Sequence, residues 1–179
     1  VIINSYNRGK YLNDAISALK GLDYPNFEVI AVNDGSKDGT AEILDELQQT
    51  YSRLRVVHLA ENQGKAYALK AGAMVSQHEY LICIDGDALL HPHAVLWMMH
   101  HLTGFPRVGA VTGNPRIINR SSILGKIQVG EFSSIIGLIK RSQRTYGRIF
   151  TVSGVLVGFR KTALDRIGYW RDDMITEDI

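Results

Sequence analysis

The feature that most limits the fold of this chain is the alternation of short apolar segments with helix-like segments over its first ninety residues. The apolar segments are rich in branched and aromatic residues, as buried strands are, and lie at residues 1–3, 27–32, 54–59 and 80–84. Between them, apolar residues are spaced by three and four, as in helices, at residues 11–22, 40–51 and 65–75. This alternation predicts an α/β fold, with a mostly parallel sheet and helices on both faces.

The second half of the chain is less regular. Strands are expected at residues 108–112 and 152–159, and helices at residues 92–102, 123–146 and 161–167. No repeat, low-complexity tract or linker interrupts the sequence, so we expect one domain over residues 1–179. Val1 lies inside an apolar run and Ile179 follows a cluster of acids, so we expect a domain cut at both ends.

Composition excludes several classes of protein. The 20 basic and 18 acidic side chains give a net charge of +2, far from the basic character of a nucleic-acid-binding domain. A single cysteine, Cys83, cannot form an internal disulfide or a cysteine-built zinc site, which favours a reducing compartment. No apolar run approaches the roughly 18 to 20 residues needed to span a bilayer.

Basic residues are concentrated in one segment. Residues 107–148 carry eight lysines and arginines and one acid, Glu131. Such a segment beside an acidic first half fits a site that gathers phosphate around a cation, but on charge alone an unevenly charged solvated surface is the favoured explanation. The amphipathic helix expected at 123–146 either docks on the sheet or lies on a membrane surface.

Acidic residues follow two of the expected strands, where ligands bind in open parallel sheets. Asp34 ends one strand within Val32–Ser36, so its carboxylate can accept a hydrogen bond from uracil N3–H or cap a turn. Asp85 and Asp87 flank Gly86 after another strand. Two such carboxylates can bind Mg²⁺ or Mn²⁺, and with it a diphosphate, although a solvated turn has the same sequence pattern.

Two further segments carry groups that could bind phosphate or accept a proton. Lys65 follows Asn62-Gln-Gly64 at an expected helix start, where backbone N–H groups and an ammonium can meet phosphate. The spacing matches neither a Walker A loop nor a dinucleotide fingerprint. Near the end, Glu177 and Asp178 lie in an acidic stretch that is either an exposed loop or the source of a general base.

Asp34, the Asp85-Gly-Asp87 string and Thr176-Glu-Asp178 occur in the order in which the family 2 glycosyltransferases carry such acids, and the whole chain resembles that family. Members are inverting enzymes with a Rossmann-like GT-A fold that use nucleotide-sugar donors. Three longer strings are most similar to the membrane synthases of poly-β-1,6-N-acetylglucosamine: Ala110–Ile117, Gly125–Glu131 and Ser134–Arg141.

The resemblance implies different functions for two parts of the chain. Residues 1–113 would bind the nucleotide and residues 114–179 would face the acceptor. By this resemblance, Asp34 would contact the uracil ring and Asp85 the nucleoside side of the donor. Asp87 would hold the metal ion, and Asp178 would be the catalytic base. Lys65 joins the nucleotide-binding residues, and the acceptor side comprises Ser153, Gly154 and Glu177.

The implied reaction is metal-dependent transfer of N-acetylglucosamine from UDP-N-acetylglucosamine to a growing β-linked polysaccharide of a biofilm. The parent would be embedded in the membrane, act at its cytoplasmic face and pair with a small membrane subunit. Alternatives are a non-processive transferase with a lipid or protein acceptor, and a non-catalytic nucleotide-binding module. The chain departs from relatives at Asn4–Arg8, which lacks their proline and acid, and it ends before their Q-x-x-R-W element.

Overall fold

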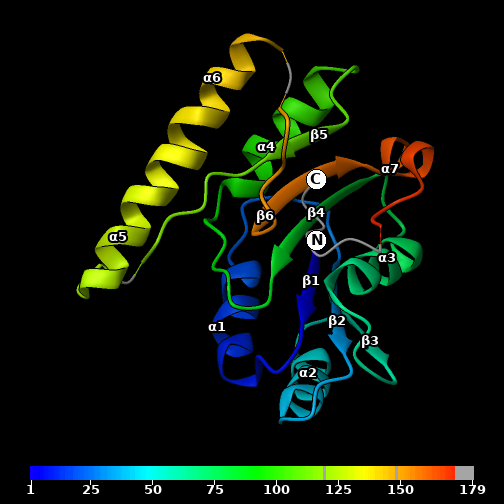
Figure 1. Ribbon diagram of the computed structural model, residues 1–179. Coiled ribbons are helices and arrows are strands. Elements are labelled where there is room, and N and C mark those ends of the chain that lie inside the picture. Colours follow the sequence, from blue (N-terminus) through cyan, green and yellow to red (C-terminus); the bar gives the residue numbers. More distant parts are fainter. Residues whose placement is uncertain (119, 148, 172–179) are drawn as a thin grey trace.

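A six-stranded mixed sheet organises the computed structural model, which describes residues 1–118, 120–147 and 149–171 (Figure 1). Its strands, in spatial order, are β3 (Leu54–Leu59), β2 (Val29–Asp34), β1 (Ile2–Ser5), β4 (Tyr80–Asp85), β6 (Leu156–Arg160) and β5 (Ala110–Thr112). Strands β1 to β4 pair in parallel, whereas β6 runs antiparallel to both of its neighbours. The expected α/β fold with a mostly parallel sheet is therefore confirmed.

The helices fall close to the ranges expected from apolar spacing. They are α1 (Gly9–Lys20), α2 (Thr40–Thr50), α3 (Lys65–Val75), α4 (Ala94–Gly104), α5 (Ile123–Phe132), α6 (Lys140–Thr145) and α7 (Lys161–Ile167). A π-helical segment, η1 (Ser133–Ile139), joins α5 to α6, so the long helix expected at 123–146 is present with a widened middle. Within the described residues, no helix combines the length and apolar character needed to cross a bilayer.

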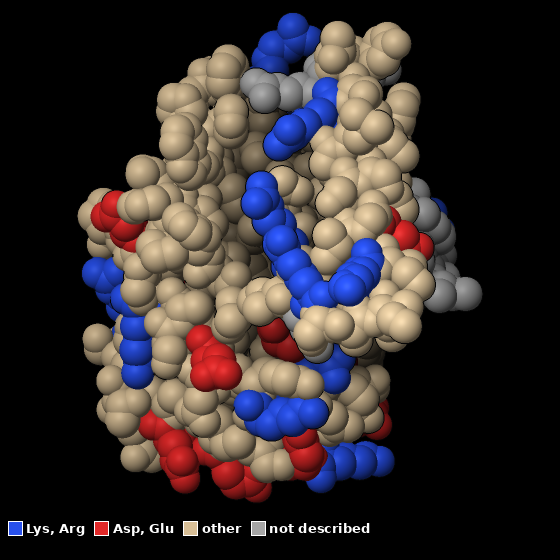
Figure 2. Space-filling view, turned by 90° about the vertical axis from the view of Figure 1, so that its left-hand side faces the viewer, with Lys and Arg blue, Asp and Glu red and all other residues tan. Residues whose placement is uncertain are grey.

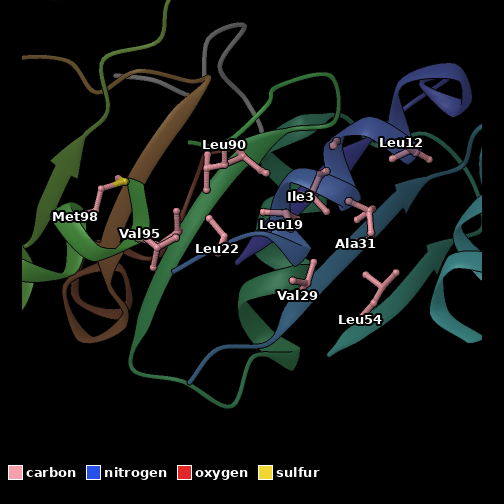
Figure 3. Packing of buried hydrophobic residues seen from close by; sticks show 14 of the residues in the cluster. Ile3, Leu12, Leu19, Leu22, Val29, Ala31, Leu54, Leu90, Val95 and Met98 are labelled. Carbon is pink, nitrogen blue, oxygen red and sulfur yellow. The ribbon is translucent and has the colours of Figure 1, made fainter. Parts of the chain in front are cut away.

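Strand alternation divides the core into two layers. Ile3, Ala31 and Ile84 point to the face covered by α1, α2 and α4, and Figure 3 shows part of this cluster. Their strand neighbours, including Ile2 and Cys83, point to the opposite face, which packs against α3 and α7. Burial raises the pKa of the Cys83 thiol to about 12, so this cysteine is an inert core residue, as expected.

The long helix stands away from the sheet (Figure 1). Ile123 is 80% exposed, and Leu124 and Leu138 are each 66% exposed. The expectation that the helix docks its apolar residues on the sheet is wrong for these three side chains. The helix instead presents them on the molecular surface.

The turn after β2 lies directly against the loop after β3. Gly35 has a positive φ of 60°, and a Cβ atom built there would lie 2.3 Å from the backbone carbonyl carbon of Glu61. Only glycine fits this position, because it lacks the side chain that would overlap the neighbouring backbone. The close approach sets the spacing of two loops at the carboxyl edge of the sheet.

We expect the substitution Gly35→Ala to lower the free energy of unfolding by about 1–3 kcal/mol, because it adds an overlap to a strained φ. Urea denaturation measures this change. Gly39→Ala is the matched control, since Gly39 has a negative φ and no atom within 4 Å of its built Cβ. Equal stability of the two variants would contradict the close approach of the loops.

Candidate functional site

The strand order reverses beside β1, which pairs with β2 on one side and β4 on the other. Asn4 is in register with Asp85, and Ser5 is in register with Asn33. The carboxyl ends of all three strands therefore meet at one edge. In open α/β sheets this switch in strand order opens a crevice in which ligands bind.

Asp34, the last residue of β2, is buried and holds the loop that leads into α3. Its Oδ2 accepts hydrogen bonds from Asn62 Nδ2 and from Gly64 N, both at 2.9 Å. Its Oδ1 accepts one from Gln63 N at 2.8 Å. Sequence reasoning assigned Asp34 to a ligand and missed this positioning of the loop. The Asn-Gln-Gly string before a helix was the available signal.

Lys65, the first residue of α3, joins the two parts of the expected site. Its Nζ lies 2.9 Å from Asp85 Oδ1 and donates to the Gly154 carbonyl oxygen, also at 2.9 Å. Ser153 is buried beside this contact, and its backbone N–H donates to Thr112 Oγ1 at 2.9 Å. The structure thus brings Lys65, Asp85, Ser153 and Gly154 together.

Asp87 follows Asp85 by two residues and pairs with Arg8 rather than with Lys65. Its Oδ2 is 3.2 Å from Arg8 Nε, and both side chains are about half exposed. Gly86 between the two acids leaves no room for a side chain, since a Cβ would lie 2.6 Å from Ser5 Oγ. The turn carrying both carboxylates is therefore pressed against the end of β1. Sequence reasoning had not placed Arg8 in the site.

The position of Arg8 is fixed through the loop before α2. Thr40 Oγ1 accepts a hydrogen bond from the Arg8 backbone N–H at 3.1 Å. Asp38 in turn accepts from the Thr40 hydroxyl and from the Gly9 backbone N–H. The Thr40 hydroxyl lowers the pKa of the Asp38 carboxyl, which keeps this junction negatively charged near the Arg8 backbone.

Asp85 and Asp87 line one cavity of about 950 Å³. Its walls come from α4, the turn after β4 and the loop after β5, with Trp97, Leu156 and Arg116 among the lining residues. An apolar cleft with a few converging polar groups is the usual form of a small-molecule site.

The two carboxylates fit a divalent cation. They are hard oxygen donors that line the same cavity, and each lies beside one positive side chain, Lys65 or Arg8. In the described part of the chain, no group of three or more potential metal ligands gathers. Glu177 and Asp178 lie outside the described residues.

Comparison with known families decides the identity of the fold. The model of glycosyl transferase family 2 matches residues 1–168. The chain belongs to this family. The poly-β-1,6-N-acetyl-D-glucosamine synthase of Staphylococcus epidermidis is 47% identical over 99% of the chain, and that of Staphylococcus aureus strain COL is 44% identical over the same share. The chain spans 43% of the length of each of these relatives.

Solved structures share the fold. The mannosyltransferase PcManGT from Pyrobaculum calidifontis, in complex with GDP-Man and Mn²⁺, has a TM-score of 0.78 at 23% identity, covering 99% of this chain and 48% of that one. TarS 1–349 of Staphylococcus aureus, in complex with UDP-GlcNAc, has a TM-score of 0.66 at 18% identity, covering 95% and 47%. These likenesses confirm the expected GT-A architecture.

We expect Asp34→Asn to lower the free energy of unfolding by about 1–3 kcal/mol. The substitution replaces one acceptor oxygen with an amide N–H group, which would then face an N–H donor of loop 62–64 without an acceptor between them. Amide exchange at Gln63 and Gly64 should accelerate together with this loss. Asp14→Asn on the exposed face of α1 is the control and should change neither quantity. Unchanged exchange at residues 63 and 64 in Asp34→Asn would remove the positioning role.

Proposed function

We propose that this domain transfers N-acetylglucosamine from UDP-N-acetylglucosamine to a growing β-linked polysaccharide. The observation that carries the proposal is the pair Asp85 and Asp87 on one cavity wall, with Lys65 bound to the first of them. The synthases that are 44–47% identical over nearly the whole chain support the sugar and the polymer. The UDP-GlcNAc complex of a structural neighbour supports the donor.

We assign the donor to the carboxyl ends of β2 and β4. The family resemblance supports Asp34 as the residue at the uracil ring, and its Oδ1 accepts one hydrogen bond within the protein. Lys65 and Asp85 would hold the ribose and phosphate side. Asp87 would hold Mg²⁺ or Mn²⁺, which when bound neutralises charge on the diphosphate of the leaving UDP. The Mn²⁺ complex of the mannosyltransferase supports this choice of ion.

We assign the acceptor side to Ser153, Gly154, Glu177 and Asp178. The acceptor hydroxyl oxygen forms a bond to the anomeric carbon while the bond from that carbon to the diphosphate oxygen breaks. The hydroxyl proton passes to Asp178, and UDP leaves with the bonding electrons. A single displacement of this kind inverts the anomeric configuration and needs a base within about 3 Å of the hydroxyl.

We place the parent protein at the cytoplasmic face of the cell membrane, with a small membrane subunit as partner. The exposed apolar side chains of α5 and η1 support contact with a lipid surface, as do the eight basic residues of 107–148. The small membrane subunit is carried over from the expectation that the family resemblance raised in the sequence.

We expect Asp87→Ala to abolish Mn²⁺-dependent binding of UDP while leaving the fold intact, because Asp87 is an exposed acid outside the core. Calorimetric titration of UDP with and without Mn²⁺ measures this. Asp14→Ala removes an equal charge from the exposed face of α1 and should bind as the wild type does. If the affinity of Asp87→Ala for UDP still depends on Mn²⁺, the assignment of the metal to Asp87 is contradicted.

For the full-length parent, we expect Asp178→Asn to bind UDP-N-acetylglucosamine normally but to lose transfer by about 10²–10⁴-fold, because the amide cannot accept the proton. Release of UDP in the presence of acceptor measures transfer. Substantial polymer synthesis by this variant would exclude Asp178 as the base. Normal donor binding with no transfer by the wild-type parent would favour a non-catalytic nucleotide-binding module.

A further inference from the structure

A second hollow lies beside the carboxylate cavity, between the loop after β5 and the long helix. It has a volume of about 490 Å³, and three arginines line it: Arg116, Arg120 and Arg141. Figure 2 shows lysine and arginine side chains gathered along a hollow on the face that carries α5 and α6, with the acidic side chains clustered mainly below it. The hollow brings together charges from two segments of the chain.

In the part of the chain that the structure describes, these three guanidinium groups have no carboxylate partner. Among the described residues, no acid lies within ion-pair distance of any of them. Arg120 Nε donates to the Ile117 carbonyl oxygen at 3.0 Å, which leaves the two terminal nitrogens of that side chain for another acceptor. Glu131, the single acid between residues 107 and 148, does not line the hollow. Three like charges around one hollow repel each other, and a bound anion would offset this repulsion.

The remaining lining residues narrow the class of ligand. Val129 and Phe132 of α5 and Leu138 of η1 line the same hollow. Guanidinium forks match the oxygens of phosphate, and aliphatic and aromatic side chains match an apolar group joined to it. We propose that this hollow, which we call the arginine hollow, binds a phosphate-bearing ligand with an apolar portion. A lipid headgroup and a soluble organic phosphate share this chemistry.

The arginine hollow adjoins the donor site and shares Arg116 with it, whereas Arg120 and Arg141 line only the hollow. The loop residues Asn114–Ile117 and the Phe132 side chain border both cavities, but Asp85 and Asp87 line only the larger one. An anion beside those two carboxylates needs a metal ion, whereas an anion among three arginines does not. Binding in the hollow is therefore independent of Mn²⁺ and of Asp87.

The test titrates inorganic pyrophosphate into the 179-residue chain in the presence of chelator. We expect binding that weakens by about threefold or more in Arg120→Gln and in Arg141→Gln, and further in the double variant, because each removes one exposed charge. Raising the salt concentration should weaken it as well. Lys126→Gln, a neighbouring exposed cation that does not line the hollow, should leave it unchanged, and so should Asp87→Ala.

A parallel titration of UDP with Mn²⁺ separates this proposal from the proposed function. The arginine variants should keep that binding, and Asp87→Ala should lose it. Sedimentation with phosphatidylcholine vesicles, with and without phosphatidylglycerol, distinguishes the sources: arginine-dependent binding to the anionic vesicles identifies a lipid headgroup, and pyrophosphate binding alone identifies a soluble phosphate. Pyrophosphate binding that survives the double variant would overturn the proposal, as would a wild-type chain that binds neither probe.

Discussion

The parallel pairing of β1 with both β2 and β4 is the constraint on which the candidate site depends. Because β1 lies between these strands, Ser5, Asp34 and Asp85 reach the same edge of the sheet, although they come from three separate parts of the sequence. The backbone register fixes their spacing before any side chain contributes. Gly86 and Gly35 then bring the loops beyond the strands into direct contact with neighbouring backbone. The position of the acids is thus a property of the sheet.

Much of this arrangement follows from the sequence. Apolar spacing separates strands from helices, and parallel sheets bring ligand-binding residues to their carboxyl ends, so Asp34, Asp85 and Asp87 could be placed at one edge. The three donors around Asp34 could not be foreseen, because they depend on how loop 62–64 folds back. The contact of Lys65 with Gly154 joins residues 89 positions apart, and only tertiary structure reveals it. Periodicity likewise marked the apolar residues of the long helix without showing that they face outward.

Charge is distributed in two distinct ways on this surface. At the carboxylate cavity, acids and cations alternate, with Lys65 on Asp85 and Arg8 on Asp87. At the arginine hollow, three arginines lie together, and none of the described residues that line it is an acid. The first arrangement suits a ligand that contains both a cation and an anion, and the second suits an anion alone. The net charge of this surface does not distinguish the two neighbouring sites. The contacts of individual side chains do.

The strand order also bears on how the chain reaches this structure. Ile2 of β1 pairs with Cys83 of β4, and Tyr80 of β4 pairs with Arg160 of β6. Both β1 and β4 therefore pair with a strand that lies about eighty residues further along the chain. Pairings of such high sequence separation require large loops to close first, which slows folding. During synthesis, β1 to β3 emerge with one edge of β1 unpaired, and that edge is open to wrong partners until β4 follows. The same central position that assembles the site therefore makes the nascent sheet prone to aggregation.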